Sequence, residues 1–399
     1  MQEKTTTRSI LIIVENLPVP FDRRVWQEAT ALKQYGYGVS VICPKGKGHN
    51  LSYENIDGIN IYRHSLPLEA SGAMGFLLEY SAALFWQFFL SLKVLRVHGF
   101  DVIHACNPPD LIFLIGGFYK ILLGKKFVFD QHDLNPELYV VKFKRKGFFH
   151  WLLQKAERLT FKCADVSIAT NETFKKIAIE RGGMAADRVW VVKSYPDLKR
   201  FKIVAPDTSL KRDFSFLIGY VGIMAEQDGV DILVRAMAHL VKEEGRNDIG
   251  CIIIGDGPEL ENLRALAVKL GVEKYVKFTG FLTGEELLGH LCALDVGIIP
   301  DPPNDCNEKL SMNKVFEYMA LGIPFVQFDL EQSRSEAGDA ALVAVEGTPE
   351  SMAEAITTLL TDEPSRVEMS EYGKKRAQLE FQWENEKKSL IEAYATLWQ

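Results

Sequence analysis

One stretch of the chain reads Lys309-Leu-Ser-Met-Asn-Lys-Val-Phe-Glu317-Tyr-Met-Ala-Leu-Gly322-Ile-Pro324-Phe-Val-Gln-Phe328. Its apolar residues follow a helical spacing as far as Leu321, and Gly322 supplies the conformation at which helices commonly end. The run from Phe325 to Phe328 is short and apolar, as buried strands are. The stretch therefore predicts a helix followed by a strand, which is the repeating element of a parallel α/β sheet.

The same alternation of short apolar runs and helical patterns extends outward from this stretch. Helical patterns include residues 23–35, 111–123 and 171–181. Strands are predicted at 10–14, 39–43, 101–105, 127–130, 166–170, 189–193, 216–221, 250–254, 276–279, 296–300 and 325–328. This pattern indicates an α/β fold with parallel sheets, in which ligands bind at the carboxyl ends of the strands.

A polar, proline-punctuated stretch at 194–213 interrupts the alternation and marks a domain boundary. The chain has 399 residues, 47% of them hydrophobic, which is enough apolar material for two cores. We predict two Rossmann-like domains, an N-terminal one over 1–200 and a C-terminal one over 214–380.

The net charge of -7 is unevenly distributed. The first 200 residues hold 27 basic and 19 acidic residues, whereas the remainder holds 19 basic and 34 acidic residues. An acidic C-terminal half is a poor surface for nucleic acid, so we expect no nucleic-acid partner. A basic N-terminal half suits an anionic membrane or a phosphorylated acceptor, although solvated surface charge explains it equally well.

The six cysteines are scattered singly, without the spacing of metal ligands or redox dithiols. We therefore expect no metal and no cofactor. The first apolar run, 9–14, is shorter than the core of a secretory signal, and a cytoplasmic location is expected.

The predicted helix after Ser311 has the features of an anion site. Its first turn presents unpaired N–H groups near Asn313 and Lys314, which can bind a diphosphate together with the Lys314 ammonium. Glu317 lies about one turn further along and can accept hydrogen bonds from the two hydroxyls of a ribose. The alternative for Glu317 is an ordinary surface glutamate on an amphipathic helix.

Glycines mark two further strand ends in the predicted C-terminal domain. Gly222 follows the first strand of the C-terminal domain, and Gly255-Asp256-Gly257 ends the next strand. These residues permit close backbone approach where a nucleobase or ribose would lie. The third glycine of a dinucleotide fingerprint is missing, which argues against an NAD enzyme.

Charged residues open the helix after the first strand of the N-terminal domain. Asp22, Arg23 and Arg24 are placed to meet a phosphate or sugar of an acceptor. The alternative is that Asp22 is only an N-cap and that the arginines form surface salt bridges.

Two segments raise the question of a membrane. Residues 75–95 are strongly apolar but are interrupted by Glu79, Gln87, Ser91 and Lys93, which favours a buried or interfacial helix over a spanning one. The segment from Lys142 to Leu153 sets four cations beside aromatic and aliphatic residues, as peripheral membrane sites do. An ordinary helix start with an apolar core side is an equal alternative.

Taken together, the motifs resemble those of the GT-B glycosyltransferases of family four, a retaining family that builds bacterial polysaccharides and glycolipids. The resemblance covers nearly the whole chain and lies in residues 16–24, 101–110, 130–137, 222–231, 255–259, 278–281 and 313–324. It implies an acceptor site on the N-terminal domain, a nucleotide-sugar site on the C-terminal domain, a cleft between them, and a helix over 381–399 that returns to the N-terminal domain.

The sequence departs from the family pattern at two places. The family commonly has two glutamates separated by seven residues; Glu317 matches the second, but Lys309 stands at the first, with Glu308 beside it. The family's basic pair for the diphosphate is replaced by Ile223 and Asp228. We therefore expect Lys309 and Lys314, with backbone amides near Gly222, to compensate the diphosphate charge.

The resemblance also places an active-site histidine at His132, after the strand 127–130. We expect His132 to bond the donor sugar or the reacting hydroxyl, with Asp133 and Glu137 orienting it or contacting the acceptor. His104, after another strand, is expected to be structural.

The predicted function is transfer of a sugar, with retention and without a metal, from a nucleotide diphosphate sugar to a saccharide or lipid-linked acceptor. UDP-sugars are the commonest donors in the family. The enzyme is expected in the cytoplasm or at the inner face of the cytoplasmic membrane. Two alternatives remain: a nucleotide-sugar epimerase of the same fold, and a non-catalytic nucleotide-sugar-binding subunit.

Overall fold

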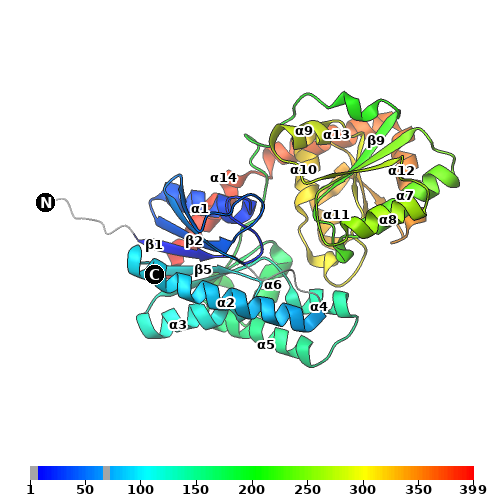
Figure 1. The fold of residues 1–399 in the computed structure, drawn as a ribbon. Helices are drawn as coiled ribbons and strands as arrows, with labels where there is room; N and C mark the ends of the chain where they lie inside the picture. The colour runs from blue at the N-terminus through cyan, green and yellow to red at the C-terminus, as the bar shows by residue number, and fades with distance from the viewer. Residues whose placement is uncertain (1–7, 66–71) are drawn as a thin grey trace. The chain divides into compact units, whose positions relative to one another are not determined.

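A computed structural model describes residues 8–65 and 72–399. The chain divides into two compact units (Figure 1). The N-terminal unit comprises Met1–Ser194 together with Glu384–Gln399, and the C-terminal unit comprises Tyr195–Trp383. Helix α14, Trp383–Ala395, thus belongs almost entirely to the N-terminal unit, although it ends the chain.

The N-terminal unit is built on an eight-stranded sheet of order β3-β4-β2-β1-β5-β6-β7-β8. Only the edge strand β3 runs antiparallel to its neighbour. The strands are β1 Ser9–Ile13, β2 Gly38–Pro44, β3 Tyr53–Ile56, β4 Ile59–His64, β5 Val102–Cys106, β6 Lys126–Gln131, β7 Val166–Ala169 and β8 Val189–Val191.

Helices cover both faces of this sheet. Besides α14 they are α1 Arg23–Tyr35, α2 Gly72–Val97, α3 Phe113–Leu123, α4 Asn135–Phe143, α5 Phe148–Cys163 and α6 Glu172–Glu180. The start of α1 shows how the sequence sets these bounds. Asp22 accepts a hydrogen bond from the Val25 N–H, and Gly36 ends the helix at a φ of 110°.

The C-terminal unit has a six-stranded parallel sheet of order β11-β10-β9-β12-β13-β14. Its strands are β9 Phe216–Val221, β10 Ile249–Ile254, β11 Val276–Gly280, β12 Val296–Ile299, β13 Phe325–Phe328 and β14 Ala341–Ala344. Its helices are α7 Val230–Lys242, α8 Leu260–Lys269, α9 Gly284–Cys292, α10 Asn313–Leu321, α11 Glu331–Ala337, α12 Pro349–Thr361 and α13 Glu363–Leu379.

The α/β fold predicted from the sequence is confirmed in each unit. In the C-terminal sheet, chain order runs outward from β9 to β11 on one side and from β12 to β14 on the other. The direction therefore reverses between β9 and β12, and in the N-terminal sheet the same reversal lies between β1 and β5. Ligands of such sheets bind beyond the carboxyl ends of the strands at this reversal.

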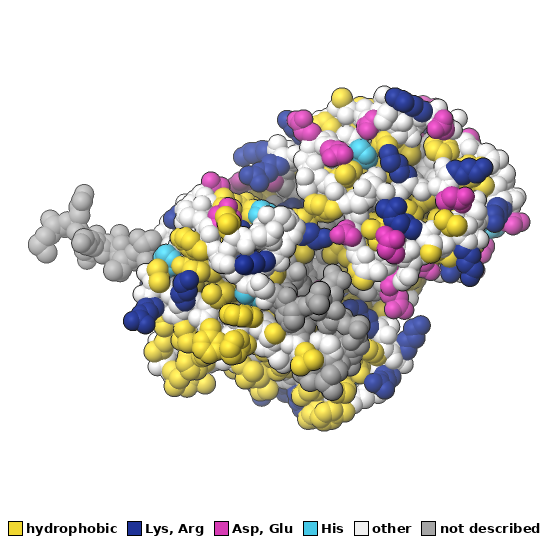
Figure 2. Space-filling view, viewed as in Figure 1, with side chains coloured by type: hydrophobic (Ala, Val, Ile, Leu, Met, Phe, Trp, Pro, Cys, Tyr) yellow, Lys and Arg dark blue, Asp and Glu magenta, His cyan; other side chains and the backbone are white. Residues whose placement is uncertain are grey.

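Helix α2 contains the strongly apolar segment. Gln87 and Ser91 are fully buried on its inner side, whereas Phe85, Trp86 and Phe89 are about half exposed. Hydrophobic side chains gather on the surface over α2, α3 and α5 (Figure 2). Across the part of the chain that the structure describes, no helix combines the length and apolarity needed to cross a membrane.

Candidate functional site

In the C-terminal unit, the loops after β9 and β10 pack backbone against backbone. The Met224 N–H donates to the Asp256 carbonyl at 3.1 Å, and the Gly222 N–H donates to the Ile254 carbonyl at 3.0 Å. A Cβ at Gly255 would lie 1.8 Å from the Gly222 carbonyl oxygen, and Gly255 has a φ of 139°. A Cβ at Gly257 would lie 2.4 Å from the Met224 carbonyl oxygen. The predicted glycines are therefore required by the contact between these two loops.

Lys314, in the first turn of α10, lies at the reversal point of the sheet. Its Nζ donates to Asp301 Oδ2 at 2.6 Å, and this aspartate follows β12. The two side chains are 11% and 6% exposed, so the ion pair is almost buried. The ammonium also lies 4.8 Å from the centre of the Tyr220 ring, at the end of β9. Lys314, which was predicted to bind a phosphate, thus already forms an ion pair with one carboxylate of the protein.

The start of α10 carries the other predicted donor residues. Met312, at the N-cap, provides no side-chain hydrogen bond to the helix, so the first-turn N–H groups are not capped by that residue. Asn313 is exposed and Glu317 is half-buried one turn further on. This arrangement can bind an anion at the helix terminus with a carboxylate nearby.

Residues at the two places where the sequence departs from the family pattern have local structural roles. Glu308 accepts a hydrogen bond from the Glu331 N–H at 2.7 Å and so binds the start of α11, while the neighbouring Lys309 ends a short 3-10 turn. Asp228 accepts from the Ala225 N–H at 3.0 Å and closes the loop after β9, where Ile223 is 57% exposed.

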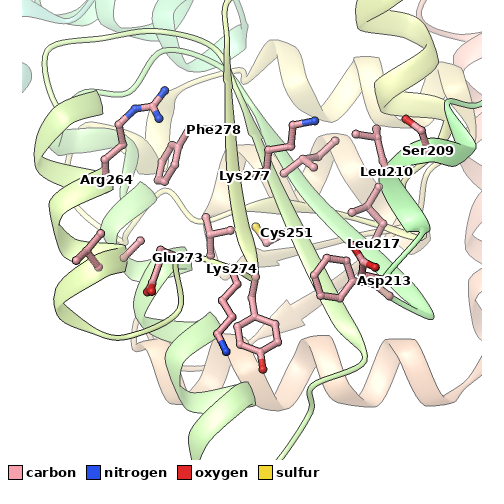
Figure 3. A pocket seen from close by; sticks show the side chains of 16 residues that line it. Ser209, Leu210, Asp213, Leu217, Cys251, Arg264, Glu273, Lys274, Lys277 and Phe278 are labelled. Carbon is pink, nitrogen blue, oxygen red and sulfur yellow. The ribbon is translucent and has the colours of Figure 1, made fainter.

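A cavity of about 540 Å³ lies elsewhere in this unit, at the β11 edge of the sheet (Figure 3). Arg264, Lys274 and Phe278 are among its lining residues. None of the predicted donor residues lines it. It is therefore separate from the candidate donor site.

In the N-terminal unit, Arg24 is buried and is bonded within the protein. Its Nε and Nη2 donate to the two oxygens of Asp130, at 3.0 and 2.6 Å, and its Nη1 donates to the Val192 carbonyl at 2.7 Å. Glu28 Oε1 lies 3.3 Å from Arg24 Nη2. The guanidinium was predicted to meet an acceptor; the structure shows it holding the carboxylate at the end of β6.

His132 lies against the same carboxylate. Its Nε2 is 2.6 Å from Asp130 Oδ2, and its backbone N–H donates to Asn107 Oδ1 at 2.7 Å. Burial acts to lower the pKa of His132, but the charge of Asp130 and the hydrogen bond to it, together with the charge of Asp22, raise the pKa above its ordinary value. The imidazole is 13% exposed.

The other predicted residues of this unit lie around His132. Asn16 Nδ2 donates to Asp133 Oδ2 at 3.3 Å, and burial raises the pKa of Asp133. Asp22 is buried and serves as the N-cap of α1, which was the alternative role considered for it. Arg23 is half-buried.

Glu137 differs from the others, because its carboxylate is held by an internal arginine. Arg181 donates to both of its oxygens, at 2.7 and 3.2 Å, and also to Glu157 at 2.7 Å. Glu137 is 9% exposed. This ion pair positions α4 rather than presenting an open carboxylate.

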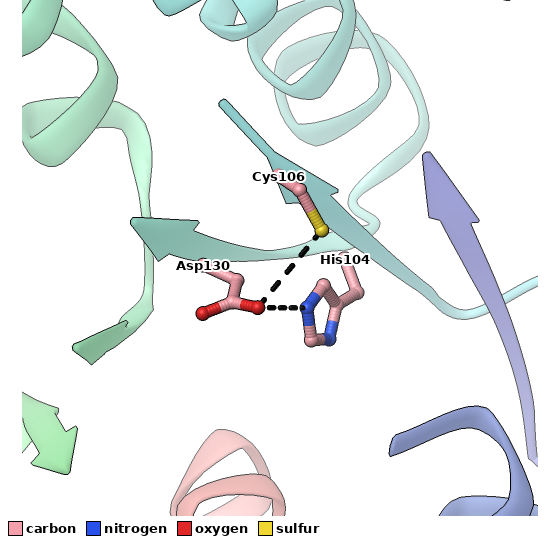
Figure 4. A group of neighbouring side chains, drawn as sticks. All are labelled: His104, Cys106 and Asp130. Carbon is pink, nitrogen blue, oxygen red and sulfur yellow. Dashed lines mark hydrogen bonds and ion pairs between the residues drawn. The ribbon is translucent and has the colours of Figure 1, made fainter. Parts of the chain in front are cut away.

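One group of side chains has the composition of a metal site. Potential ligand atoms of His104, Cys106 and Asp130 all lie within 4.8 Å of one another, and all three residues are buried (Figure 4). However, Asp130 already accepts from Arg24 and His132, and His104 Nδ1 is 2.7 Å from the Tyr394 hydroxyl of α14. A guanidinium bound to the carboxylate competes with a cation, so the donor set does not fit a metal.

Sequence reasoning missed Asp130, Glu28 and Asn107 as members of this site. Burial raises the pKa of Glu28 to about 7, with a further contribution from Asp130. The charges of Arg24 and His132 outweigh burial and hold the pKa of Asp130 well below its ordinary value. The position of Asp130 at a strand end, next to His132, was a signal that could have identified it.

Two family models match most of the chain. The model described as Glycosyltransferase Family 4 matches residues 22–200, and the model described as Glycosyl transferases group 1 matches residues 215–362. A D-inositol 3-phosphate glycosyltransferase of Corynebacterium urealyticum is 31% identical over 188 residues. That match covers 45% of this chain and only 43% of the relative.

Solved structures share the fold over nearly the full length. A sucrose-phosphate synthase from Thermosynechococcus elongatus has a TM-score of 0.79 and 18% identity, covering 98% of this chain and 99% of that one. Anabaena Alr3699/HepE, solved in complex with UDP and glucose, has a TM-score of 0.70 and 16% identity, covering 98% and 100%. With the motif blocks and the two family models, these findings show that the chain belongs to the GT-B glycosyltransferases of family four.

Proposed function

We propose that this protein transfers a sugar from a nucleotide diphosphate sugar to a saccharide or lipid-linked acceptor, with retention of configuration and without a metal. The observation that carries the proposal is the convergence of the Gly222 loop, Asp301 and Lys314 at the reversal point of the C-terminal sheet. This is where parallel α/β sheets bind nucleotides. The family membership supports the same reaction class.

On the donor side, the diphosphate would meet the first-turn N–H groups of α10 and the Lys314 ammonium. Lys314 has three N–H donors, and Asp301 accepts from one. Glu317 would bind the ribose hydroxyls. Lys309 and the amides of the Gly222 loop would add to the compensation of the diphosphate charge. A UDP-sugar is the proposed donor, since a structural neighbour was solved with UDP.

On the acceptor side, His132 would donate a hydrogen bond from its ring to the donor sugar or to the reacting hydroxyl. Asp130 favours the protonated form of His132 and fixes the ring, while Arg24 fixes Asp130. In a retaining front-face transfer the departing phosphate oxygen receives the acceptor proton, so no protein carboxylate has to form a covalent bond to the sugar. Stabilisation of the leaving diphosphate would then supply most of the rate.

We also propose contact with an anionic membrane through the segment from Lys142 to Leu153. Phe148, Phe149 and Trp151, at the start of α5, are 68%, 45% and 51% exposed. They are therefore not core residues, as the alternative interpretation would have required. Lys144, Arg145 and Lys146 are exposed beside them, in a pattern suited to the headgroup region of the inner face of the cytoplasmic membrane.

The proposal is tested by measuring stabilisation and turnover with nucleotide sugars. A thermal-shift screen across UDP-, GDP-, ADP- and dTDP-sugars should identify one base that stabilises the protein. Nucleotide release from that donor should require an added acceptor. A new sugar isomer formed without acceptor would instead indicate an epimerase, and binding without turnover on a broad acceptor panel would indicate a non-catalytic subunit.

Lys314→Met is the variant that tests the site itself. Loss of one charged hydrogen bond of about 2 kcal/mol should weaken donor binding by about thirtyfold. The variant is paired with Asp301→Asn so that no buried carboxylate is left alone, and Lys269→Met, on the exposed end of α8, is the control. Equal donor affinity in the double variant and the control would remove Lys314 from the site.

A further inference from the structure

An apolar pocket lies in the N-terminal unit between α2, α4 and α5. Its volume is about 170 Å³. The side chains of Leu138, Tyr139, Phe143, Leu152 and Leu153 supply much of its lining. Such a lining is too apolar for a sugar and suits a hydrocarbon chain.

The pocket is continuous with the exposed apolar surface of α5. Phe149 and Leu152 line the pocket and are also 45% and 42% exposed. Helices α2 and α3 also carry exposed apolar side chains, among them Phe85, Phe89 and Leu122. Hydrophobic side chains gather on the surface over α2, α3 and α5 (Figure 2). A chain entering the pocket would therefore leave an apolar surface and not bulk water.

The pocket also has polar lining residues, and these connect to the loop that holds His132 and Asp133. Asp110, Asn135 and Lys142 are also lining residues. Asn107 Nδ2 donates to both Asp110 Oδ1 and the Asp133 carbonyl, each at 2.8 Å. Lys142 and Asn135 line the pocket from the two ends of α4, and this helix begins two residues after Asp133.

We propose that this pocket binds the hydrocarbon chain of a lipid-linked acceptor, with the phosphate of its headgroup beside Lys142 and its sugar or hydroxyl end toward His132 and Asp133. The inference rests on the proposed glycosyl transfer and selects, between saccharide and lipid-linked acceptors, the second class. The apolar lining suits the hydrocarbon chain, and Lys142 suits the anionic headgroup. His132 and Asp133 suit the reacting hydroxyl.

The test uses the full chain and a series of monoalkyl phosphates from hexyl to dodecyl, each below its micelle concentration. Affinity measured by titration calorimetry should rise about fourfold per methylene while the pocket fills, and then level off. A rise without a plateau indicates adsorption to the exposed surface and would overturn the pocket assignment. Decyl glucoside, with the same chain and no charge, should bind more weakly, and Lys142→Met should abolish the difference.

Two variants change the pocket and one matched variant changes only the surface. Leu153→Trp fills the cavity and Leu138→Asn makes it polar, so each should weaken decyl phosphate binding at least about tenfold. Leu159→Ser, 45% exposed on the same helix but not lining the cavity, should leave that affinity unchanged. Equal losses in all three variants would contradict the proposal.

A cross-linking measurement keeps the test independent of how well the variants fold. A decyl phosphate with a diazirine near the end of the chain should label peptides within residues 138–156 of the wild type. Labelling confined to other regions would overturn the inference. If UDP-sugars stabilise the protein but alkyl phosphates do not bind, this inference alone fails; if neither binds, the proposed function fails first.

Discussion

Replacing Asp110 by asparagine should change how the stability of the N-terminal unit depends on pH. Asp110 is 3% exposed, and burial raises the pKa of its carboxyl from 3.8 to about 7, with the charge of Glu157 adding to the effect. The folded state therefore holds this proton at pH values at which the unfolded chain has released it. Its contribution to stability is complete below about pH 3.8 and is lost as the pH rises through 7.

The size of the effect follows from the two pKa values. A difference of one in pKa corresponds to about 1.4 kcal/mol, so a rise from 3.8 to about 7 corresponds to about 4 kcal/mol at most by pH 8.5. Asparagine cannot ionise, and its side-chain oxygen can still accept from Asn107. Asp110→Asn should therefore gain stability relative to the wild type by up to this amount between pH 4 and pH 8.5.

Urea unfolding followed by tryptophan fluorescence measures this difference. Five of the six tryptophans lie in the N-terminal unit, so the signal reports mainly on that unit. Asp187→Asn, at an exposed site of the same unit, is the control and should give a curve parallel to the wild type. If the free energies of unfolding of Asp110→Asn and wild type differ by the same amount at every pH, the assignment of a buried, protonated Asp110 is refuted.

Two further variants test the loops and the charge cluster. Gly255→Ala should destabilise the C-terminal unit by at least about 2 kcal/mol in hydrogen-exchange measurements, since its Cβ would lie 1.8 Å from the Gly222 carbonyl oxygen. Gly280→Ala, at a φ of 76° with open space around it, is the control and should cost less. Arg24→Met should cost about 3–5 kcal/mol of N-terminal unit stability, because it removes the guanidinium that binds both oxygens of the buried Asp130. A loss below about 1 kcal/mol in the same urea assay would show that the ion pair does not stabilise the unit.

Most strands of the parallel sheets were predictable because they are short apolar runs with turn residues on both sides. The prediction at 216–221 matches β9, and that at 325–328 matches β13. The hairpin of β3 and β4 was missed, although Asp57-Gly58 between two apolar runs is a recognised turn signal. The edge strand β14 was also missed, because Ala341–Ala344 is too short and too weakly β-forming to stand out.

The roles of charged residues at the site were harder to predict than the elements that hold them. The sequence placed Arg24 at the start of a helix beside a strand end, and the structure agrees. Whether such an arginine faces solvent or a buried carboxylate depends on a residue 106 positions away, Asp130, which no local pattern reveals. The ion pairs of Glu137 with Arg181 and of Lys314 with Asp301 were likewise not predicted, while the predicted contacts of these two residues with ligands stay predictions.

These pairs bear on how a diphosphate with two or more negative charges could bind. At the reversal point of the N-terminal sheet a cation meets a buried carboxylate, Arg24 with Asp130, and at that of the C-terminal sheet Lys314 meets Asp301. Each pair is close to neutral, so an anionic ligand gains less from the cation than the cation's charge alone suggests. The carboxylate nevertheless holds the cation in one position, which lowers the entropy lost when a ligand binds. The basic pair of the family pattern is replaced here by Ile223 and Asp228, so in the proposed donor site the backbone N–H groups at α10 and the Gly222 loop would supply a larger share of the binding. Binding that relies on hydrogen bonds from backbone N–H groups in direct contact with the ligand depends less on salt concentration than binding by exposed lysines at a distance, because salt screens long-range interactions most.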